Sequence, residues 1–252
     1  GRKSAIAIEH AREQVAELMG CQANEVYFTS GATEAINWGI KGYLSANPNS
    51  GNEIISVRTE HKATLQTLEY LEELGYEITY LDVNRGGLID TKELEELITD
   101  NTALVCIMAV NNETGVIQPI NDIGLILQEK GICFFSDTTQ AVGKIEMQFS
   151  NYVQLQCISA HKFGGPKGIG ALCIKSNTKV TPLIHGGGQE KQLRGGTYNT
   201  PLIVGLGKAA ELISKNFAEL QFQSLEKINE IIDYFEQEKI GIRNFTEFET
   251  VH

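Results

Sequence analysis

Short apolar runs alternate along the chain with longer segments in which apolar residues recur every three or four positions. The short runs have the length of buried strands, and they lie at residues 25–29, 53–58, 77–81, 103–110, 132–135, 155–158 and 168–175. The amphipathic segments predict helices at residues 4–20, 30–45, 62–75, 91–98, 121–130, 201–215 and 217–239. Because strands and helices alternate without an internal repeat, we expect an α/β fold with a mostly parallel seven-stranded sheet and helices on both faces. The short connection before residues 168–175 predicts that this strand runs antiparallel.

Composition narrows the class of protein. With 252 residues and 42% hydrophobic content, the chain can bury one large α/β core. Thirty-two acidic residues against 21 basic ones give a formal net charge of −11, which argues against binding to nucleic acid or to an anionic membrane surface. No apolar run approaches the roughly 20 residues of a membrane-spanning helix, and no signal-peptide pattern opens the chain. We therefore expect a cytoplasmic protein.

The five cysteines show no CxxC pair and no spacing typical of a metal site. Four of them lie inside apolar runs, and we expect all five to be reduced thiols buried in the core. An odd count in a cytoplasmic setting also disfavours a disulfide framework. We expect neither a metal nor a disulfide.

Polar side chains follow the carboxyl ends of the predicted strands. They are His61, Asn112, Asp137, Gln140, Ser159, His161 and Lys162. In open parallel sheets, ligands bind beyond the carboxyl ends of the strands. The pattern therefore predicts that these side chains converge on one ligand site.

Lys162 stands between the apolar run 155–158 and a loop rich in glycine. A lysine at a strand end, beside a hydroxyl and an imidazole, suits covalent attachment of pyridoxal phosphate through a Schiff base. The alternative is a solvated loop lysine. The segment from Ser30 to Glu34 turns from a strand directly into a helix, whose free N–H groups favour a phosphate; the alternative here is an ordinary capped helix start.

His61 and Asp137 also allow two interpretations. A lone histidine at this position is more often a helix cap or a core residue than a ligand. An aspartate after an apolar strand is a helix cap about as often as it is a partner for a cofactor. A carboxylate there could hold a pyridine nitrogen protonated through a charge-assisted hydrogen bond.

Six motifs occur in the order found in the NifS/IscS-type cysteine desulfurases. This family belongs to the class V aminotransferase group of fold-type-I pyridoxal phosphate enzymes, and the resemblance covers residues 1 to about 220. The motifs are Thr29-Ser30-Gly31-Ala32-Thr33-Glu34, Thr59-Glu60-His61-Lys62-Ala63, Val110-Asn111-Asn112-Glu113-Thr114-Gly115, Asp137-Thr138-Thr139-Gln140, Ser159-Ala160-His161-Lys162-Phe163-Gly164-Gly165-Pro166, and His185-Gly186-Gly187-Gly188-Gln189-Glu190 continuing to Arg194-Gly195-Gly196-Thr197.

The resemblance implies a role for each site residue. Lys162 would carry the cofactor and move protons, and His61 would stack on the pyridine ring. Asp137 would bind the ring nitrogen, while Gln140 and Asn112 would contact the phenolate side. The phosphate would be held by Thr33, Ser159, His161 and the backbone at Ala32, and by Thr197 of a neighbouring subunit, which implies a homodimer.

The resemblance also implies an activity and a domain division. Such enzymes convert L-cysteine to L-alanine, hold the sulfur as a persulfide and pass it to acceptor or scaffold proteins, for example in iron–sulfur cluster assembly. Residues 1–215 would form the cofactor-binding large domain, and residues 216–252 a linker helix and the start of a small domain. The family's sulfur-accepting cysteine and substrate-carboxylate arginine belong to the small-domain half, so we expect an incomplete enzyme. The alternatives are another class V enzyme, such as a selenocysteine or cystine lyase, and a non-catalytic scaffold.

Overall fold

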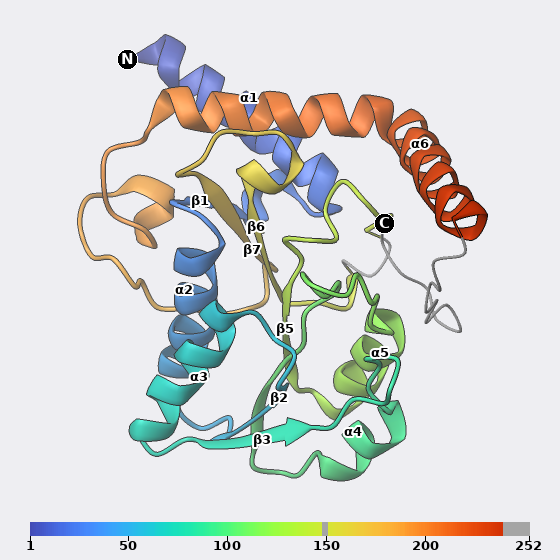
Figure 1. Cartoon of the computed structure of the whole chain (residues 1–252). Coiled ribbons are helices and arrows are strands. Elements are labelled where there is room, and N and C mark those ends of the chain that lie inside the picture. The colour runs from blue at the N-terminus through green and yellow to red at the C-terminus, as the bar shows by residue number, and fades with distance from the viewer. Residues whose placement is uncertain (148–150, 239–252) are drawn as a thin grey trace.

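The computed structural model describes residues 1–147 and 151–238 and is built around one seven-stranded sheet (Figure 1). The strands are β1 (Val26–Thr29), β2 (Glu53–Val57), β3 (Glu77–Leu81), β4 (Thr102–Cys106), β5 (Cys133–Asp137), β6 (Leu155–Ser159) and β7 (Gly170–Ile174). Their order across the sheet is β1-β7-β6-β5-β4-β2-β3. All neighbours are parallel except β7, which is antiparallel to both β1 and β6. The predicted fold class and the antiparallel strand are confirmed.

Helices cover both faces of the sheet (Figure 1). They are α1 (Arg2–Met19), α2 (Ala32–Ala46), α3 (Lys62–Glu73), α4 (Thr91–Leu97), α5 (Ile120–Lys130) and α6 (Thr200–Gln237), with short 3₁₀ turns η1 (Ala23–Glu25), η3 (Ala160–Phe163) and η4 (Gln189–Gln192). Side chains alternate between the faces: Phe134 packs with α4 and α5, whereas Phe135 packs with α2 and α3. The helices α1 and α6 cover β1, β7 and β6 on the same face as α4 and α5.

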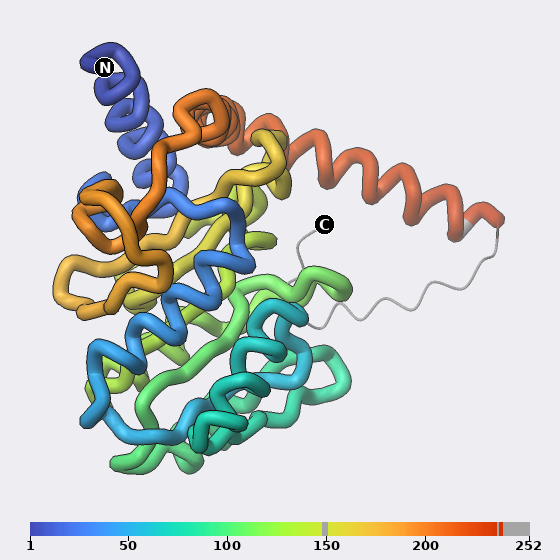
Figure 2. The backbone as a smooth tube through the Cα atoms, turned by 90° about the vertical axis from the view of Figure 1, so that its left-hand side faces the viewer, coloured from blue at the N-terminus to red at the C-terminus, as the bar shows by residue number. Residues whose placement is uncertain are grey.

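The helix α6 is one continuous element of 38 residues where the sequence predicts two consecutive helices. Its first half packs closely on α1, since a Cβ atom on Gly207 would lie 2.6 Å from the Cα atom of Ala11. Its second half extends away from the sheet (Figure 2) and exposes apolar side chains such as Phe222. The domain boundary near residue 215 stays a prediction, and residues 239–252 of the proposed small domain lie outside the described residues. None of the described helices is long and apolar enough to cross a membrane.

The strand predicted at residues 103–110 is too long, because β4 ends at Cys106. The apolar run continues and stays buried, and its backbone keeps its bonds to β5 but loses those to β2. Ile107 and Ala109 donate to carbonyl groups of β5, and the Met108 N–H donates to the side chain of Glu60. The run therefore leaves the ladder with β2 while remaining in the core.

Candidate functional site

Beyond the carboxyl ends of the parallel strands lies a cavity of about 480 Å³. Nine of the ten predicted site residues line it: Ala32, Thr33, His61, Asn112, Asp137, Gln140, Ser159, His161 and Lys162. The tenth, Thr197, lines a cavity of about 210 Å³ that shares Ser30 and Gly168 with the first. The structure thus brings the predicted residues together, while their individual roles stay predictions.

Lys162 lies in the turn η3, directly after β6. The turn is closed by hydrogen bonds from the Ala160 N–H to the Ile169 carbonyl at 3.1 Å and from the Gly165 N–H to the Ala160 carbonyl at 2.9 Å. A Cβ atom on Gly165 would lie 2.8 Å from the Ala160 Cβ atom, so the loop requires glycine there. Within the described part of the chain, no hydrogen bond engages the Lys162 amine, which leaves it available to a ligand.

Asp137 ends β5, the strand next to β6, and its side chain is only 6% exposed. Its Oδ1 atom accepts hydrogen bonds from the Thr139 N–H at 2.9 Å and from the Cys157 thiol at 3.4 Å. The bond from the Thr139 N–H closes a local turn and is not a helix cap, because residues 139–144 form turns and no described helix begins there. No described residue donates to Oδ2, and the side chain also lines the cavity, so this oxygen is free to accept a hydrogen bond from a ligand.

A second buried carboxyl group, Glu60, supports this corner of the site. Burial and the nearby charge of Asp137 raise the pKa of Glu60 to about 8, although the hydrogen bond from the Met108 N–H opposes the shift. Glu60 is therefore largely protonated at neutral pH. Sequence reasoning missed it, although it stands inside the Thr59-Glu60-His61 motif.

His61 is the N-cap of α3, and its Nδ1 atom accepts a hydrogen bond from the Ala63 N–H at 3.1 Å. The capping interpretation is thus confirmed, and the ring lines the cavity as well. An accepting Nδ1 atom means that the neutral ring carries its proton on Nε2. The cap fixes both the tautomer and the position of the ring.

Gln140 accepts a hydrogen bond from the Lys144 ammonium group through its Oε1 atom. Because the oxygen is occupied, the amide NH₂ group is the part of Gln140 left to meet a ligand. Burial and the charge of Lys162 lower the pKa of Lys144. Sequence reasoning missed Lys144, whose only signal was its position four residues after Gln140.

Asn111, the neighbour of the predicted Asn112, shapes the loop that carries it. Its Oδ1 atom accepts from the N–H groups of Glu113 and Thr114, and its Nδ2 atom donates to the Thr59 carbonyl at 2.9 Å. These bonds tie the loop after β4 to the loop after β2. Asn112 is left to line the cavity.

The opposite end of the cavity is formed by the start of α2. Gly31 caps the helix with φ 153° and ψ −179°, a conformation that favours glycine. A Cβ atom on Gly170 would lie 2.7 Å from the Gly31 Cα atom, so two glycines allow the helix to approach β7 and β6. The first N–H groups of the helix have no intrahelical partner and attract an anion.

Side chains around this helix start add further donors. Ser159 Oγ and His161 Nδ1 lie 2.9 Å apart. Burial, together with the charges of Lys162 and Lys167, lowers the pKa of His161, so its ring is neutral at neutral pH. Hydroxyl, imidazole and backbone N–H groups together match the oxygens of a phosphate group.

An ion pair fixes the first turn of α2. Arg194 donates to Glu34 through two nitrogens, at 2.8 and 3.1 Å, and Glu34 also accepts from the Ser30 N–H at 2.8 Å. This contact holds the glycine-rich loop that contains Thr197 against the cavity. Sequence reasoning quoted Arg194 within a motif but gave it no function.

Four of the five cysteines, Cys106, Cys133, Cys157 and Cys173, are buried as predicted. Burial raises the pKa of the Cys106 and Cys157 thiols well above the ordinary range. The prediction is wrong for Cys21, which is half-buried. None of the five lines the cavity.

The donor set fits pyridoxal phosphate. The cofactor needs an amine for its aldehyde, a carboxylate for its ring nitrogen and an anion site for its phosphate. Lys162, Asp137 with its free Oδ2 atom, and the start of α2 supply these three groups around one cavity. The fold and these side chains define an α/β domain with a polar, ligand-sized cavity at the carboxyl edge of its sheet.

Comparison with known proteins identifies the family. The family model described as Aminotransferase class-V matches residues 1–247. The protein named cysteine desulfurase IscS from Ehrlichia chaffeensis is 50% identical over 223 residues, which are 87% of this chain and 54% of that protein. The structure of DndA from Streptomyces lividans has a TM-score of 0.88 at 33% identity, over 93% of this chain and 68% of that one. A structure described as SspA in complex with cysteine has a TM-score of 0.79 at 44% identity, over 83% of this chain and 61% of that one.

The chain belongs to the class-V aminotransferase family. Within that family, its relatives at 46–50% identity carry the name cysteine desulfurase IscS, and a NifS-like protein is among its structural neighbours, which confirms the resemblance to the NifS/IscS type. The chain spans about half the length of the curated relatives it matches.

Proposed function

We propose that this chain binds pyridoxal phosphate in the 480 Å³ cavity and forms the cofactor-binding part of a cysteine desulfurase. One observation carries the proposal. The Lys162 amine and the Asp137 carboxylate follow two adjacent strands, β6 and β5, and line the same cavity as the start of α2. An amine, a carboxylate and an anion site around one cavity match the three polar parts of this cofactor.

Each predicted side chain has a place in this proposal. Asp137 Oδ2 would accept a hydrogen bond from the ring nitrogen, the His61 ring would cover the pyridine, and Lys162 Nζ would hold the aldehyde carbon. The Gln140 amide and Asn112 would contact the phenolate side. The phosphate would be held by the backbone at Ala32 and by Thr33, Ser159 and His161, with Thr197 contributed by the partner in a homodimer.

The cofactor supplies an electron sink that stabilises negative charge at the α-carbon of a bound amino acid. The chain's residues do the rest. Asp137 would keep the ring nitrogen protonated. Once the substrate amine had displaced Lys162 from the cofactor, the freed Lys162 Nζ would take the proton from the substrate α-carbon and return it, as general base and then acid. The Lys144 ammonium group occupies Gln140 Oε1 and so leaves the Gln140 NH₂ group for the cofactor.

We propose L-cysteine as the substrate, which leaves as L-alanine after its sulfur has passed to a thiolate as a persulfide. The support is the similarity to the cysteine-bound SspA structure. We assign the sulfur-accepting thiol to none of the chain's cysteines, because none lines the cavity and four are buried. A sulfur acceptor or scaffold protein receives the sulfur, in iron–sulfur cluster assembly or a related pathway.

The test compares two lysines in the same cavity. The protein is incubated with pyridoxal phosphate, treated with borohydride and digested, and the modified peptide is identified by mass spectrometry. We expect the label on Lys162 and a visible absorption band that Lys162→Ala abolishes. Lys167→Ala is the matched control, because Lys167 also lines the cavity. A colourless protein, or labelling that moves equally with either substitution, contradicts the proposal.

A further inference from the structure

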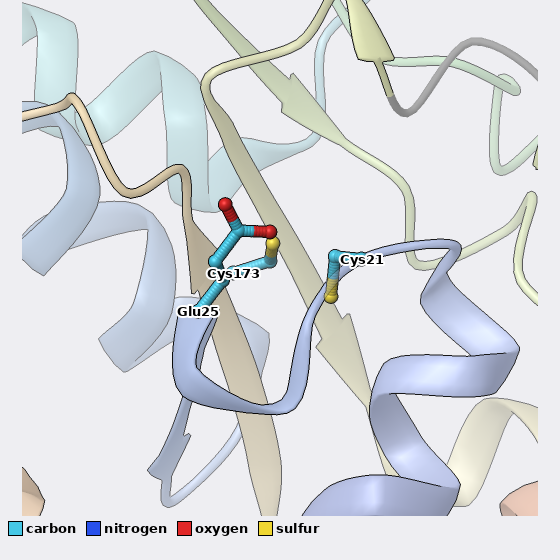
Figure 3. A group of neighbouring side chains, drawn as sticks. All are labelled: Cys21, Glu25 and Cys173. Atoms are coloured by element: carbon cyan, nitrogen blue, oxygen red, sulfur yellow. The ribbon is translucent and has the colours of Figure 1, made fainter.

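Cys21, Glu25 and Cys173 lie close together (Figure 3), and none of them lines the cavity. Cys21 follows the end of α1, Glu25 belongs to the turn η1, and Cys173 lies within β7. The two sulfurs and one carboxylate oxygen all lie within 4.8 Å of one another. Because 152 positions separate Cys21 from Cys173 in the sequence, no local spacing could reveal this group.

The group lies away from the predicted catalytic edge. In the β1–β7 pair, Gly170 stands opposite Thr29, whose strand end leads into the cavity, whereas Cys173 stands opposite Val26. Three residues along a strand span about 10 Å. Chemistry at this group is therefore separate from the proposed cofactor chemistry.

The surrounding hydrogen bonds hold all three side chains in place. The Cys21 N–H donates to the Ala16 carbonyl at 3.0 Å, behind Gly20 in the left-handed conformation that ends α1. Glu25 accepts from the Gln22 N–H and from the Ser176 N–H, both at 3.0 Å. Cys173 is fixed by the sheet. Such a preformed arrangement loses little conformational entropy on binding a ligand.

We propose that Cys21, Glu25 and Cys173 form a binding site for a thiophilic divalent cation, with Zn²⁺ as its natural occupant. Two sulfurs and one oxygen are ligands that Zn²⁺ prefers, and the half-buried Cys21 leaves the fourth position to water. Ideal tetrahedral bonds of about 2.3 Å to sulfur and about 2.1 Å to oxygen place these atoms roughly 3.5–3.8 Å apart. From separations of up to 4.8 Å, the observed group needs to contract by roughly 1.0–1.3 Å at most.

The charges around the site are balanced. Zn²⁺ with two thiolates and one carboxylate carries a net charge of −1. The Lys175 ammonium group lies 3.5 Å from Glu25 and supplies the compensating positive charge. Metal binding would connect the end of α1, the turn η1 and β7, so its role is to fasten the first helix to the sheet. This inference is independent of the proposed function.

Titration of the reduced full chain with Cd²⁺ tests the site, because cadmium bound to thiolates gives an ultraviolet charge-transfer band. We expect the band to saturate at one Cd²⁺ per chain, and Zn²⁺ alone to raise the thermal midpoint. Cys21→Ser should remove both the absorption band and the rise in thermal midpoint. This variant is preferred to Cys173→Ala because Cys21 is half-buried, whereas a substitution at the buried Cys173 would also disturb the core. Glu25→Gln keeps the band, which comes from the thiolates, but weakens binding by about tenfold or more.

Cys133→Ala is the matched control, since Cys133 is a buried cysteine outside the group. It should bind Cd²⁺ like the unmodified chain. Three results overturn the proposal: no band in the reduced protein, the same band in Cys21→Ser, or loss of the band in Cys133→Ala. A chain whose Cys21 and Cys173 oxidise to a disulfide and which ignores Cd²⁺ after reduction also overturns it.

Discussion

Removing one partner of the buried ion pair between Arg12 and Glu190 should destabilise the protein severely. Arg12 donates from two nitrogens to the two oxygens of Glu190, both at 2.9 Å, and the side chains are 6% and 3% exposed. The same two side chains also bind the backbone of β1: Arg12 donates to the Val26 carbonyl at 2.6 Å, and Glu190 accepts from the Phe28 N–H at 3.0 Å. The pair thus joins α1, β1 and η4.

The expected loss in the free energy of unfolding follows from the burial of both side chains. Arg12→Met leaves a buried carboxylate without its partner, and Glu190→Gln leaves a buried guanidinium group, so each should cost about 3–5 kcal/mol. For a chain of this size, that corresponds to a fall in thermal midpoint of about 6–20 °C. The double variant removes both charges, while the amide oxygen introduced by Glu190→Gln still accepts from Phe28. Glu9 also loses its bond from Arg12 but is exposed to water, so the main remaining cost is the buried Val26 carbonyl, at about 1–3 kcal/mol.

The assay is the free energy of unfolding in urea at neutral pH for the four proteins of this double-mutant cycle. We expect the double variant to be more stable than the sum of the two single changes by about 3 kcal/mol or more. Lys130→Met is the control, because Lys130 forms a loose surface pair with Glu95 at 3.8 Å and should leave stability unchanged within error. A coupling energy below about 0.5 kcal/mol would refute the reasoning, since independent sites add within that range.

Three further predictions concern the site. Between pH 4.5 and about 8 the unfolded chain releases the Glu60 proton while the folded protein keeps it, so the free energy of unfolding falls as pH rises through this window. Glu60→Gln should remove this dependence on pH. If urea titrations at several pH values give the same slope for the variant, the raised pKa is contradicted. Gly170→Ala forces a Cβ atom to within 2.4 Å of the Ile158 carbonyl oxygen and should abolish pyridoxal phosphate binding. Gly188→Ala is the control, because a Cβ atom there has open space around it. Equal absorption spectra of the two variants after incubation with the cofactor would refute this prediction. A polypeptide of residues 1–252 should produce alanine from cysteine at a rate near background, because loss of a nucleophile commonly costs several powers of ten in rate. Robust alanine release that disappears when one cysteine is replaced would show that this cysteine accepts the sulfur.

Most strands could be predicted because a strand covered on both faces is an uninterrupted apolar run. The buried strands β5 and β6 extend only one or two residues beyond their predicted bounds. The edge strand β3, which is only partly buried, has the predicted bounds without being such a run. The prediction of one strand failed at residues 107–110, where burial and the bonds to β5 continue but the pairing with β2 ends. Apolarity reports burial and does not report which ladder a residue joins.

The candidate site could be located because the polar residues that end parallel strands must meet at one edge. The residues that sequence reasoning missed act through partners chosen by tertiary structure. Arg12 and Glu190 are 178 positions apart, and Arg194 and Glu34 are 160 apart. Nothing in a local pattern distinguishes such residues from surface charges.

The antiparallel strand β7 explains how the cavity acquires its two ends. A parallel strand would need a crossover, but the glycine loop after Lys162 is short enough to turn the chain back beside β6. The turn brings Gly170 against Gly31, and that contact sets the start of α2 beside the lysine loop. Because β7 also pairs with β1, which leads directly into α2, the lysine end and the helix end of the cavity are fixed by the same strand. A side chain at Gly170 would push the two ends apart, so the single reversed strand is what makes the proposed cofactor site possible.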